Sequence, residues 1–314
     1  MIPRHRRRPL KVGIQLPEVE RSVRWPELLD MARAAEEVGF DSLWVGDHLL
    51  YRDEDLPPRG PWEAWSVLAA LAAVTDKVEL GPLVASVSFH NPAMLAKKAS
   101  TIDEISGGRL ILGLGAGWNE PEYRAFGFPF DHRVDRFEEA LAIIRGLLRE
   151  GAVDFVGRYH QARDCLLLPP PRRPNGPSIM VGTQGPRMLE LAAAHADAWN
   201  AWFTWYGNRP EGLRSLRGKV DAACESVGRD PATLERTVAV LVQVGEGDMA
   251  QRGGPVEERS PIRGSADEMA EALRAFSAEG ISHVQIVVEP ITIEAIESLG
   301  PVLEELDAGA DAAG

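Results

Sequence analysis

The chain has 314 residues, of which 45% are apolar and 26% are charged, and it contains no apolar run near the roughly 18 residues of a membrane-spanning helix. This composition predicts a soluble globular fold with a large core and excludes an integral membrane protein and a disordered chain. The 47 acidic and 34 basic residues give a formal net charge of −13, which repels phosphate backbones and argues against nucleic-acid binding. Cys165 and Cys224 lie far apart without metal-ligand spacing, which fits a reducing cytoplasm.

Short β-branched segments alternate with amphipathic helical segments from Lys11 onward, which is the pattern of a parallel sheet covered by helices. The eight predicted strands are residues 12–16, 42–45, 78–84, 110–114, 179–181, 198–201, 238–244 and 284–288. No phosphate-binding fingerprint occurs at the end of the first predicted strand, which carries Gln15 instead. Eight β/α units in about 300 residues therefore favour a closed (β/α)8 TIM barrel, an α/β fold, over an open doubly wound sheet.

The two ends of the chain are expected to lie outside the barrel. A basic cluster, Arg4 to Arg8, is followed by charged residues rather than by the apolar segment of an export signal. We therefore expect a flexible basic N-terminus over residues 1–10, one barrel domain over residues 11–306 and a flexible tail over residues 307–314.

The active site of such a barrel collects where the strands end and the βα loops begin. Two predicted connections are unusually long: residues 115–133 after the fourth strand and residues 151–177 before the fifth. Long loops on this face usually cover a substrate, so both segments are expected to lie over the site as extended βα loops.

The second strand ends in Asp47 and His48, which places a carboxylate beside an imidazole at the expected mouth of the barrel. An imidazole titrates near neutral pH, and a neighbouring carboxylate fixes its tautomer and raises its pKa. The pair therefore suits general acid or base work, or a hydrogen bond to a cofactor ring. A loop histidine that merely caps a helix or packs against its neighbours remains the alternative.

The third strand contains Gly81 and Pro82, although it should be buried in the middle of the sheet. Proline removes one hydrogen-bond donor from the ladder, so we expect a bulge or an unusual peptide geometry near Leu83, Val84 and Ala85. Such a feature either serves a ligand or simply bends the strand at the barrel rim.

Glycine-rich segments follow the fourth and fifth strands. In residues 113–119 the third glycine of a dinucleotide fingerprint would fall at Trp118, so that motif is absent. The glycines instead let the backbone approach a flat ligand, with Trp118 able to stack and Asn119 able to form hydrogen bonds. Residues 182–187 lead into a helix with exposed amides, a hydroxyl and an arginine, which suits a phosphate, although barrel phosphate sites more often follow strands seven and eight.

Other chemistries have little support in the sequence. The histidines form no pair at helical ligand spacing, so no metal site is predicted, and neither a nucleophile elbow nor a Walker loop is present. Four carboxylates near strand ends leave a glycosidase pair open, because the sequence does not give their separation: Asp47, Glu120, Glu122 and Glu289.

Taken together, these residues resemble the luciferase-like monooxygenase superfamily, and in particular its coenzyme F420-dependent oxidoreductases, over nearly all of residues 11–306. The most specific segment is residues 107–119, which reads GGRLILGLGAGWN. The other matching segments are residues 39–48, 80–84, 91–97, 122–127, 133–139, 179–183, 196–200 and 228–231.

The resemblance implies a flavin or deazaflavin whose ring lies in the mouth of the barrel. Asp47 and His48 match an acid–histidine step that faces the ring, with the histidine implicated in proton transfer or substrate activation. The Leu83–Val84 step matches a non-prolyl cis peptide that presses on one ring face. Ala116 to Asn119 match residues on the other side of the ring, and Gly182 to Gly185 match a phosphate-binding loop. The full cofactor-binding set is Gln15, Leu83, Val84, Ala85, Ala116, Gly117, Trp118, Asn119, Gly182, Thr183, Gln184 and Gly185.

The expected substrate site departs from that of the F420-dependent sugar-phosphate dehydrogenases. Those enzymes carry Thr and Glu where Ala116 and Trp118 stand here, so sugar-phosphate oxidation is not expected. The expected pocket is aromatic, which favours an apolar or cyclic substrate, although each ring is equally consistent with core packing. Its residues are Trp62, Trp65, Phe89 and Trp202, together with residues of the 151–177 segment.

Two cofactor chemistries are compatible with the resemblance. With F420, the protein would transfer a hydride between the coenzyme and a small organic substrate while His48 handles the proton; with FMN, it would act as a monooxygenase that activates O2. The expected partners are the substrate, a reductase that supplies reduced cofactor and a second copy of the chain in a homodimer, with neither nucleic acid nor a membrane. A cofactor-binding protein without catalysis is a third interpretation.

Overall fold

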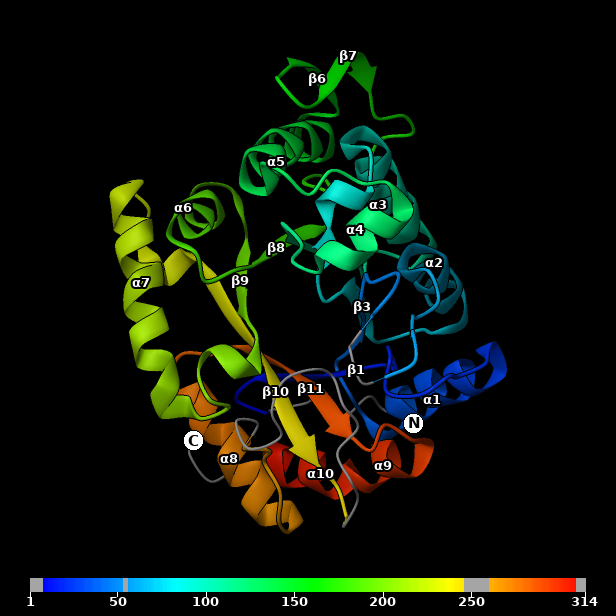
Figure 1. Ribbon diagram of the computed structural model, residues 1–314. Helices are drawn as coiled ribbons and strands as arrows, with labels where there is room; N and C mark the ends of the chain where they lie inside the picture. The colour runs from blue at the N-terminus through cyan, green and yellow to red at the C-terminus, as the bar shows by residue number, and fades with distance from the viewer. Residues whose placement is uncertain (1–7, 53–55, 246–259, 309–314) are drawn as a thin grey trace.

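The computed structural model describes residues 8–52, 56–245 and 260–308, which form a ring of parallel strands surrounded by helices (Figure 1). The strands of the ring are β1 (Lys11–Gln15), β2 (Ser42–Val45), β3 (Glu79–Pro82), β4 (Ala85–Ser86), β5 (Ile111–Gly115), β8 (Ser178–Gly182), β9 (Ala198–Ala201), β10 (Glu235–Gln243) and β11 (His283–Glu289). The helices are α1 (Trp25–Val38), α2 (Ala64–Val74), α3 (Pro92–Ile105), α4 (Glu120–Phe126), α5 (Arg133–Glu150), α6 (Pro186–His195), α7 (Leu213–Ser226), α8 (Ala266–Ala278), α9 (Ile293–Ser298) and α10 (Gly300–Ala308).

The ring closes into a barrel. Its strand order is β3-β2-β1-β11-β10-β9-β8-β5-β4, and every strand pair in it is parallel. Closure comes from Leu80 of β3, which bridges Leu110 and donates its amide hydrogen to the carbonyl of Arg109 at 3.0 Å. Because β3 and β4 are two halves of one interrupted strand, the described part of the chain forms a (β/α)8 TIM barrel, as predicted.

Each of the eight predicted strands is present, with ends that differ by up to three residues. Local signals also place the helices that separate them. For example, α1 has a proline in its first turn and ends at Gly39, whose φ of 110° is a left-handed conformation that glycine adopts without strain. The side chain of Asn91 caps α3 by accepting the amide hydrogen of Met94 at 3.1 Å. Periodicity and capping residues were therefore sufficient to indicate the repeated β/α units.

The amino-terminal half of the barrel interior is filled by an indole and its polar neighbours, Ser42, Trp44 and His283, which we call the floor. All three side chains are buried. A Cβ on Gly13 or Gly81 would lie within about 2.6 Å of the Trp44 ring, so these strand positions must be glycine for the indole to fit. The Ser42 hydroxyl accepts the indole hydrogen at 2.7 Å and lies 2.7 Å from Nε2 of His283.

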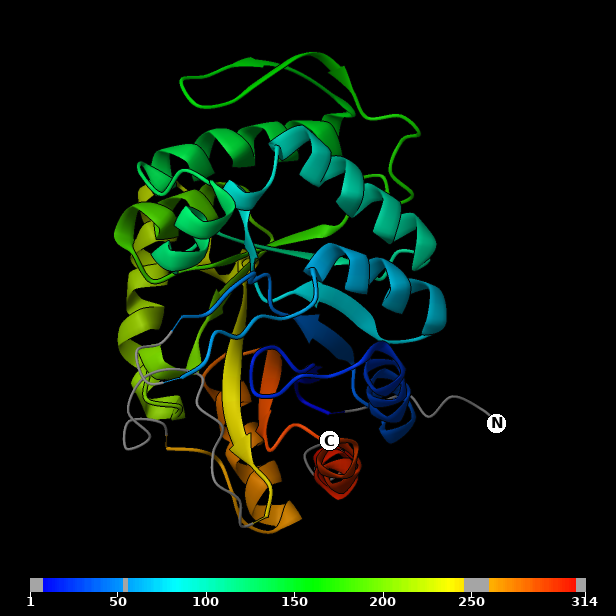
Figure 2. The ribbon, with the colours of Figure 1, turned by 45° about the vertical axis from the view of Figure 1, so that its right-hand side comes forward.

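The long segment 151–177 forms a hairpin on the outside of the barrel. Its strands β6 (Ala152–Val156) and β7 (Gln161–Leu166) pair antiparallel along α5 (Figure 2). At the turn, the amides of Arg158, Tyr159 and His160 donate to the Glu139 carboxylate of α5 at 2.7–2.8 Å. The segment leaves α5 and leads into β8, so both of its ends lie at the amino ends of the strands.

The prediction that residues 151–177 form an extended βα loop over the site is therefore wrong. Because α5 has already carried the chain back from the carboxyl end of β5, the segment is an αβ connection. Residues 115–133 do form a long βα connection at the carboxyl end of β5, and this connection contains α4. Only one of the two long segments thus lies on the predicted face.

At the N-terminus, Arg8 is held by the fold although it was expected to be flexible. Its buried guanidinium lies 3.3 Å from Asp41 and 3.0 Å from Asp307, which joins the two ends of the described chain. At the other end, Asp307 and Ala308 belong to α10. The rest of the expected flexible segments, residues 1–7 and 309–314, lies outside the described residues. Of the helices that the structure describes, none combines the length and the apolar composition needed to cross a membrane.

Candidate active site

The predicted site residues lie mainly at or just after the carboxyl ends of the strands, which we call the mouth of the barrel. Gln15 ends β1, Asp47 and His48 follow β2, and Val84 lies between β3 and β4. The segment from Ala116 to Asn119 follows β5, and Gly182 to Gly185 ends β8 and precedes α6. Parallel strands in one closed sheet bring these segments to the same end of the molecule.

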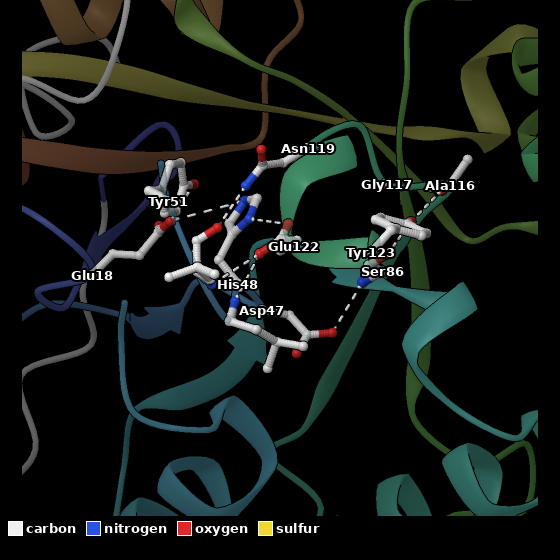
Figure 3. A network of polar contacts seen from close by, with 12 residues as sticks. Glu18, Asp47, His48, Tyr51, Ser86, Ala116, Gly117, Asn119, Glu122 and Tyr123 are labelled. Carbon is white, nitrogen blue, oxygen red and sulfur yellow. Dashed lines mark hydrogen bonds and ion pairs between the residues drawn. The ribbon is translucent and has the colours of Figure 1, made fainter. Parts of the chain in front are cut away.

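The His48 imidazole is held by carboxylates from distant parts of the chain (Figure 3). Its Nδ1 lies 2.9 Å from Oε1 of Glu122 in the first turn of α4. A carboxylate only accepts hydrogen bonds, so this contact places the hydrogen on Nδ1. Nε2 lies 3.9 Å from Oε1 of Glu18 and makes no hydrogen bond within the part of the chain that the structure describes.

Glu18, in the loop after β1, accepts hydrogen bonds from Gln15 and Tyr51. Its Oε2 accepts a hydrogen bond from Nε2 of Gln15 at 2.8 Å, and its Oε1 accepts one from the Tyr51 hydroxyl at 2.7 Å. A Cβ on Gly46 would lie 2.3 Å from the same carboxylate, so the approach requires glycine there. The Tyr51 ring packs beside His48 with 4.7 Å between ring centroids.

Asp47 does not contact the ring of its neighbour in sequence. Its Oδ2 accepts the amide hydrogen of Ser86 at 3.0 Å and lies 3.0 Å from Nε2 of His90. The pair that the sequence suggested is therefore divided, with Asp47 facing β4 and His48 facing α4. The interpretation of Asp47 as the carboxylate that fixes the His48 tautomer is wrong, and Glu122 occupies that position.

The carboxylates around His48 determine its charge. Burial by itself lowers the pKa of the imidazole, but the charge of Glu18, the hydrogen bond and charge of Glu122, and the charge of Asp47 outweigh it. The pKa of His48 is therefore raised above its ordinary value of 6.5. The site can hold a proton on this ring near neutral pH, which is the property that general acid–base chemistry requires.

The interruption of the third strand is confirmed. The peptide bond between Leu83 and Val84 is cis, and it separates β3 from β4. A Cβ on Gly115 would lie 2.8 Å from the Val84 side chain, and one on Gly182 would lie 3.0 Å from it. The glycines at the ends of β5 and β8 thus leave space that the Val84 side chain occupies inside the barrel.

The segment after β5 is held against the rest of the mouth by its backbone. The carbonyl of Ala116 accepts a hydrogen bond from the Tyr123 hydroxyl at 3.0 Å, and that of Gly117 accepts one from Arg133 at 2.7 Å. Gly117 has a φ of 75°, and a Cβ there would lie 1.8 Å from the Tyr123 hydroxyl. Trp118 is 62% exposed, and its ring lies in an edge-to-face contact with the His48 ring, with 5.6 Å between centroids.

The predicted phosphate loop ends at the first turn of α6. No side chain caps this helix, and a Cβ on Gly185 would meet no atom within 4 Å. Gln184 is exposed, whereas Thr183 is buried and its Oγ1 accepts the Gly185 amide hydrogen at 3.3 Å. Arg187 forms ion pairs with Asp135 and Glu138 of α5. The loop therefore combines open space with helix-terminal amides, as an anion site needs.

The four aromatic residues predicted to contact a substrate do not form one cluster. Trp65 is buried, and its indole hydrogen bonds to Nε2 of His90 at 3.2 Å. Phe89 is buried against Tyr123 and Phe128. Trp62 is exposed and donates to the carbonyl of Val23, and half-buried Trp202 packs on Phe203 after β9. Their contact with a substrate stays a prediction.

Sequence reasoning missed the roles of several residues that complete the mouth. These are Glu18, Tyr51, Ser86, His90 and Tyr123, which make the contacts described above. Their positions at strand ends or in the connections that follow them were the available signal. The sequence indicates Glu122 as a candidate glycosidase carboxylate and as part of a family-like segment, but not as the partner of His48. Glu120, two residues earlier, is exposed and pairs with Arg124 at 2.9 Å.

The sequence matches the family described as luciferase-like monooxygenase over residues 11–253. The pyrimidine monooxygenase RutA of Cronobacter sakazakii is 34% identical over 195 residues, which cover 60% of this chain and 56% of that protein. A 5,10-methylenetetrahydromethanopterin reductase of Archaeoglobus fulgidus is 31% identical over 221 residues, which cover 70% of this chain and 60% of that protein. This chain therefore spans less than two thirds of the length of either relative.

Among solved structures, an F420-dependent secondary alcohol dehydrogenase in complex with an F420–acetone adduct has the same fold. It superposes with a TM-score of 0.79 at 22% identity, over 95% of this chain and 99% of that chain. The match extends along nearly the whole barrel.

Proposed function

The chain belongs to the luciferase-like monooxygenase family, and on that premise we propose that it is an oxidoreductase that binds coenzyme F420 at the mouth of the barrel and acts on a small organic substrate. The observation that carries the proposal is the state of His48. Its Nδ1 is held by Glu122, its Nε2 makes no hydrogen bond to the described residues, and its pKa is raised. These properties suit a group that exchanges a proton with a bound substrate.

The residues at the mouth fit a flat cofactor with a phosphate. The space beside Gly185 and the uncapped first turn of α6 would accept the phosphate, with Gly182, Thr183 and Gln184 completing the loop. Val84, flanked by Leu83 and Ala85, would support one face of the ring, because its side chain extends over Gly115 and Gly182. Gln15 and the segment from Ala116 to Asn119 would line the other sides.

When bound, F420 supplies or accepts the hydride, and the protein supplies orientation and the proton. His48 would deliver a proton from Nε2 to a substrate oxygen that is being reduced, or take one from an alcohol that is being oxidised. Glu18 stands near Nε2 and would stabilise the protonated ring between these events. The exposed ring of Trp118 would lie beside the substrate and limit access of water to His48.

An FMN-dependent monooxygenase is the second candidate. It is favoured by the relation to RutA, whose printed name is that of a pyrimidine monooxygenase. The A. fulgidus relative, by contrast, is a reductase, which favours the first candidate. We further propose that the cofactor is reduced by a separate reductase and that two copies of the chain form a homodimer.

A parallel titration of the purified protein with F420 and with FMN tests the proposal, with quenching of tryptophan fluorescence as the readout. We expect F420 to bind more tightly than FMN, and reduction or oxidation of bound F420 to be observed by its absorbance when ketones or alcohols are supplied. Tighter binding of FMN, with O2 consumption, would select the monooxygenase instead. Binding of neither cofactor would refute both candidates.

A further inference from the structure

The partner that holds His48 lies 74 residues away in sequence, on the first turn of α4. We propose that Glu122 is the positioning residue of His48: it fixes the imidazole tautomer with hydrogen on Nδ1 and thereby makes Nε2 the nitrogen that exchanges protons at the mouth. The use of that nitrogen in catalysis rests on the proposed function, whereas the tautomer itself does not.

Both carboxylate oxygens of Glu122 accept hydrogen bonds. Its Oε1 faces Nδ1 of His48, and its Oε2 accepts the amide hydrogens of Leu49 and Leu50 at 2.8 and 3.2 Å. The side chain is 1% exposed, so water does not compete for these contacts. Backbone amides only donate, so the carboxylate must keep an oxygen toward them, and its other oxygen is left for the ring.

The surrounding structure keeps Glu122 at this place. Asn119, which precedes α4, donates from Nδ2 to the carbonyl of Leu50 at 2.9 Å. Tyr123, the next residue after Glu122, is fully buried and its hydroxyl bonds to both Ser86 and Ala116. Asn119 therefore joins the start of α4 to the loop that carries His48, and Tyr123 joins it to β4 and to the segment after β5 (Figure 3).

No other described carboxylate can replace Glu122 in this role. Asp47 is engaged by Ser86 and His90, and Glu18 is on the Nε2 side of the ring at 3.9 Å. The titratable groups that face His48 are thus Glu122 from α4, Glu18 and the Tyr51 hydroxyl from the loops after β1 and β2, and Asp47 from its own segment. Only the first of these forms a hydrogen bond with the ring.

Glu122→Gln isolates the effect of the His48 tautomer from effects of packing, because it keeps the size of the side chain. The two backbone amides require the glutamine oxygen, so the side-chain NH2 group turns toward Nδ1 of His48. An NH2 group donates, and Nδ1 must then accept, which moves the ring hydrogen to Nε2. The variant therefore reverses the tautomer while the hydrogen bonds to Leu49 and Leu50 remain.

The decisive measurement is the 15N NMR spectrum of the full-length protein labelled at histidine, recorded without cofactor and titrated above the pKa of His48. The His48 signals are assigned by their loss in His48→Gln. We expect a pyrrole-like Nδ1 and a pyridine-like Nε2 in the native protein, and the reverse pattern in Glu122→Gln. A native ring with hydrogen on Nε2, or a variant with the native pattern, would overturn the proposal. If the variant does not fold, the native spectrum alone decides.

A kinetic comparison connects the tautomer to turnover. We expect Glu122→Gln to lower kcat by about tenfold or more and to shift the pH profile, while cofactor affinity is unchanged. Glu120→Gln, which alters an exposed carboxylate two residues earlier on the same helix, is the matched control and should retain native kcat and the native NMR pattern. Reversal of the tautomer with native kcat would show that Glu122 positions the ring but that His48 does not act in the reaction. This outcome separates failure of the proposed function from failure of this inference.

Discussion

Two histidines, one at the mouth of the barrel and one in its floor, have pKa values that are shifted in opposite directions. Burial lowers the pKa of His283 from 6.5 to about 3, and the charge of Lys11 acts in the same direction. His48 is also largely enclosed, yet its pKa is raised because Glu18, Glu122 and Asp47 outweigh the cost of burial. Carboxylates, and not depth in the fold, decide which of the two rings can carry a proton.

The two histidines also differ in role, because His283 fills the barrel floor and His48 can exchange a proton. Among the described residues, the only side-chain hydrogen bond of His283 is with the Ser42 hydroxyl, which lies 2.7 Å from Nε2 of the neutral ring. That arrangement fills the barrel floor beneath Trp44 without a net charge. At the mouth, the same residue type is surrounded by groups that stabilise its cation. The floor therefore contributes to the stability of the barrel, whereas the mouth keeps a proton available for a ligand.

Replacing His48 should have the largest effect, and it tests whether the mouth histidine takes part in the reaction. Replacing the mouth histidine in His48→Gln removes the proton-exchanging group, so we expect kcat to fall by about 10²- to 10⁴-fold. Cofactor affinity in the fluorescence titration should not change, since the phosphate loop is intact. His132→Gln, at an exposed histidine paired with Asp135, is the control and should behave as the native protein. Native turnover in His48→Gln would show that the mouth histidine takes no part in the chemical step.

The floor histidine should appear in the pH dependence of stability. Because the pKa of His283 is lower in the folded protein than in the unfolded chain, the unfolded chain binds a proton first as pH falls below 6.5. The free energy of unfolding should therefore be at its full value above this pH and decrease by roughly 2 kcal/mol down to about pH 5, with further loss toward pH 3. Urea unfolding of native protein and His283→Gln measures this difference, and equal slopes in the two proteins would contradict it.

Removing the charge of one carboxylate near His48 should have the smallest effect. Glu18→Gln removes the charge nearest Nε2 of His48 but retains an acceptor for Tyr51. The pKa of His48 should then fall, because the cost of burial is less fully offset. An NMR titration of the labelled protein gives this pKa directly. An unchanged value would mean that Glu122 and Asp47 maintain the cation without Glu18.

The amino-acid sequence was sufficient for the barrel because each unit of the fold is encoded locally. Hydrophobic periodicity, the cap at Asn91 and the glycine at the end of α1 define strands and helices with short connections, and parallel β/α units of this number close in one way. The combination of Gly81 and Pro82 likewise indicated the interruption of the third strand, since proline cannot complete a central ladder. The hairpin of β6 and β7 lies on the opposite face from the predicted one, because α5 returns the chain to the amino ends of the strands before the hairpin begins.

The composition of the mouth was predictable from strand ends, but its hydrogen-bond partners were not. Asp47 and His48 are adjacent in sequence, yet neighbouring side chains leaving a strand point in different directions, so one reaches Ser86 and His90 and the other reaches Glu122. The sequence by itself determined which residues arrive at the mouth, because strand position sets that. Only the tertiary structure decided which carboxylate meets which histidine, because those contacts depend on the packing of α4 and of the loop after β1 against the strand ends.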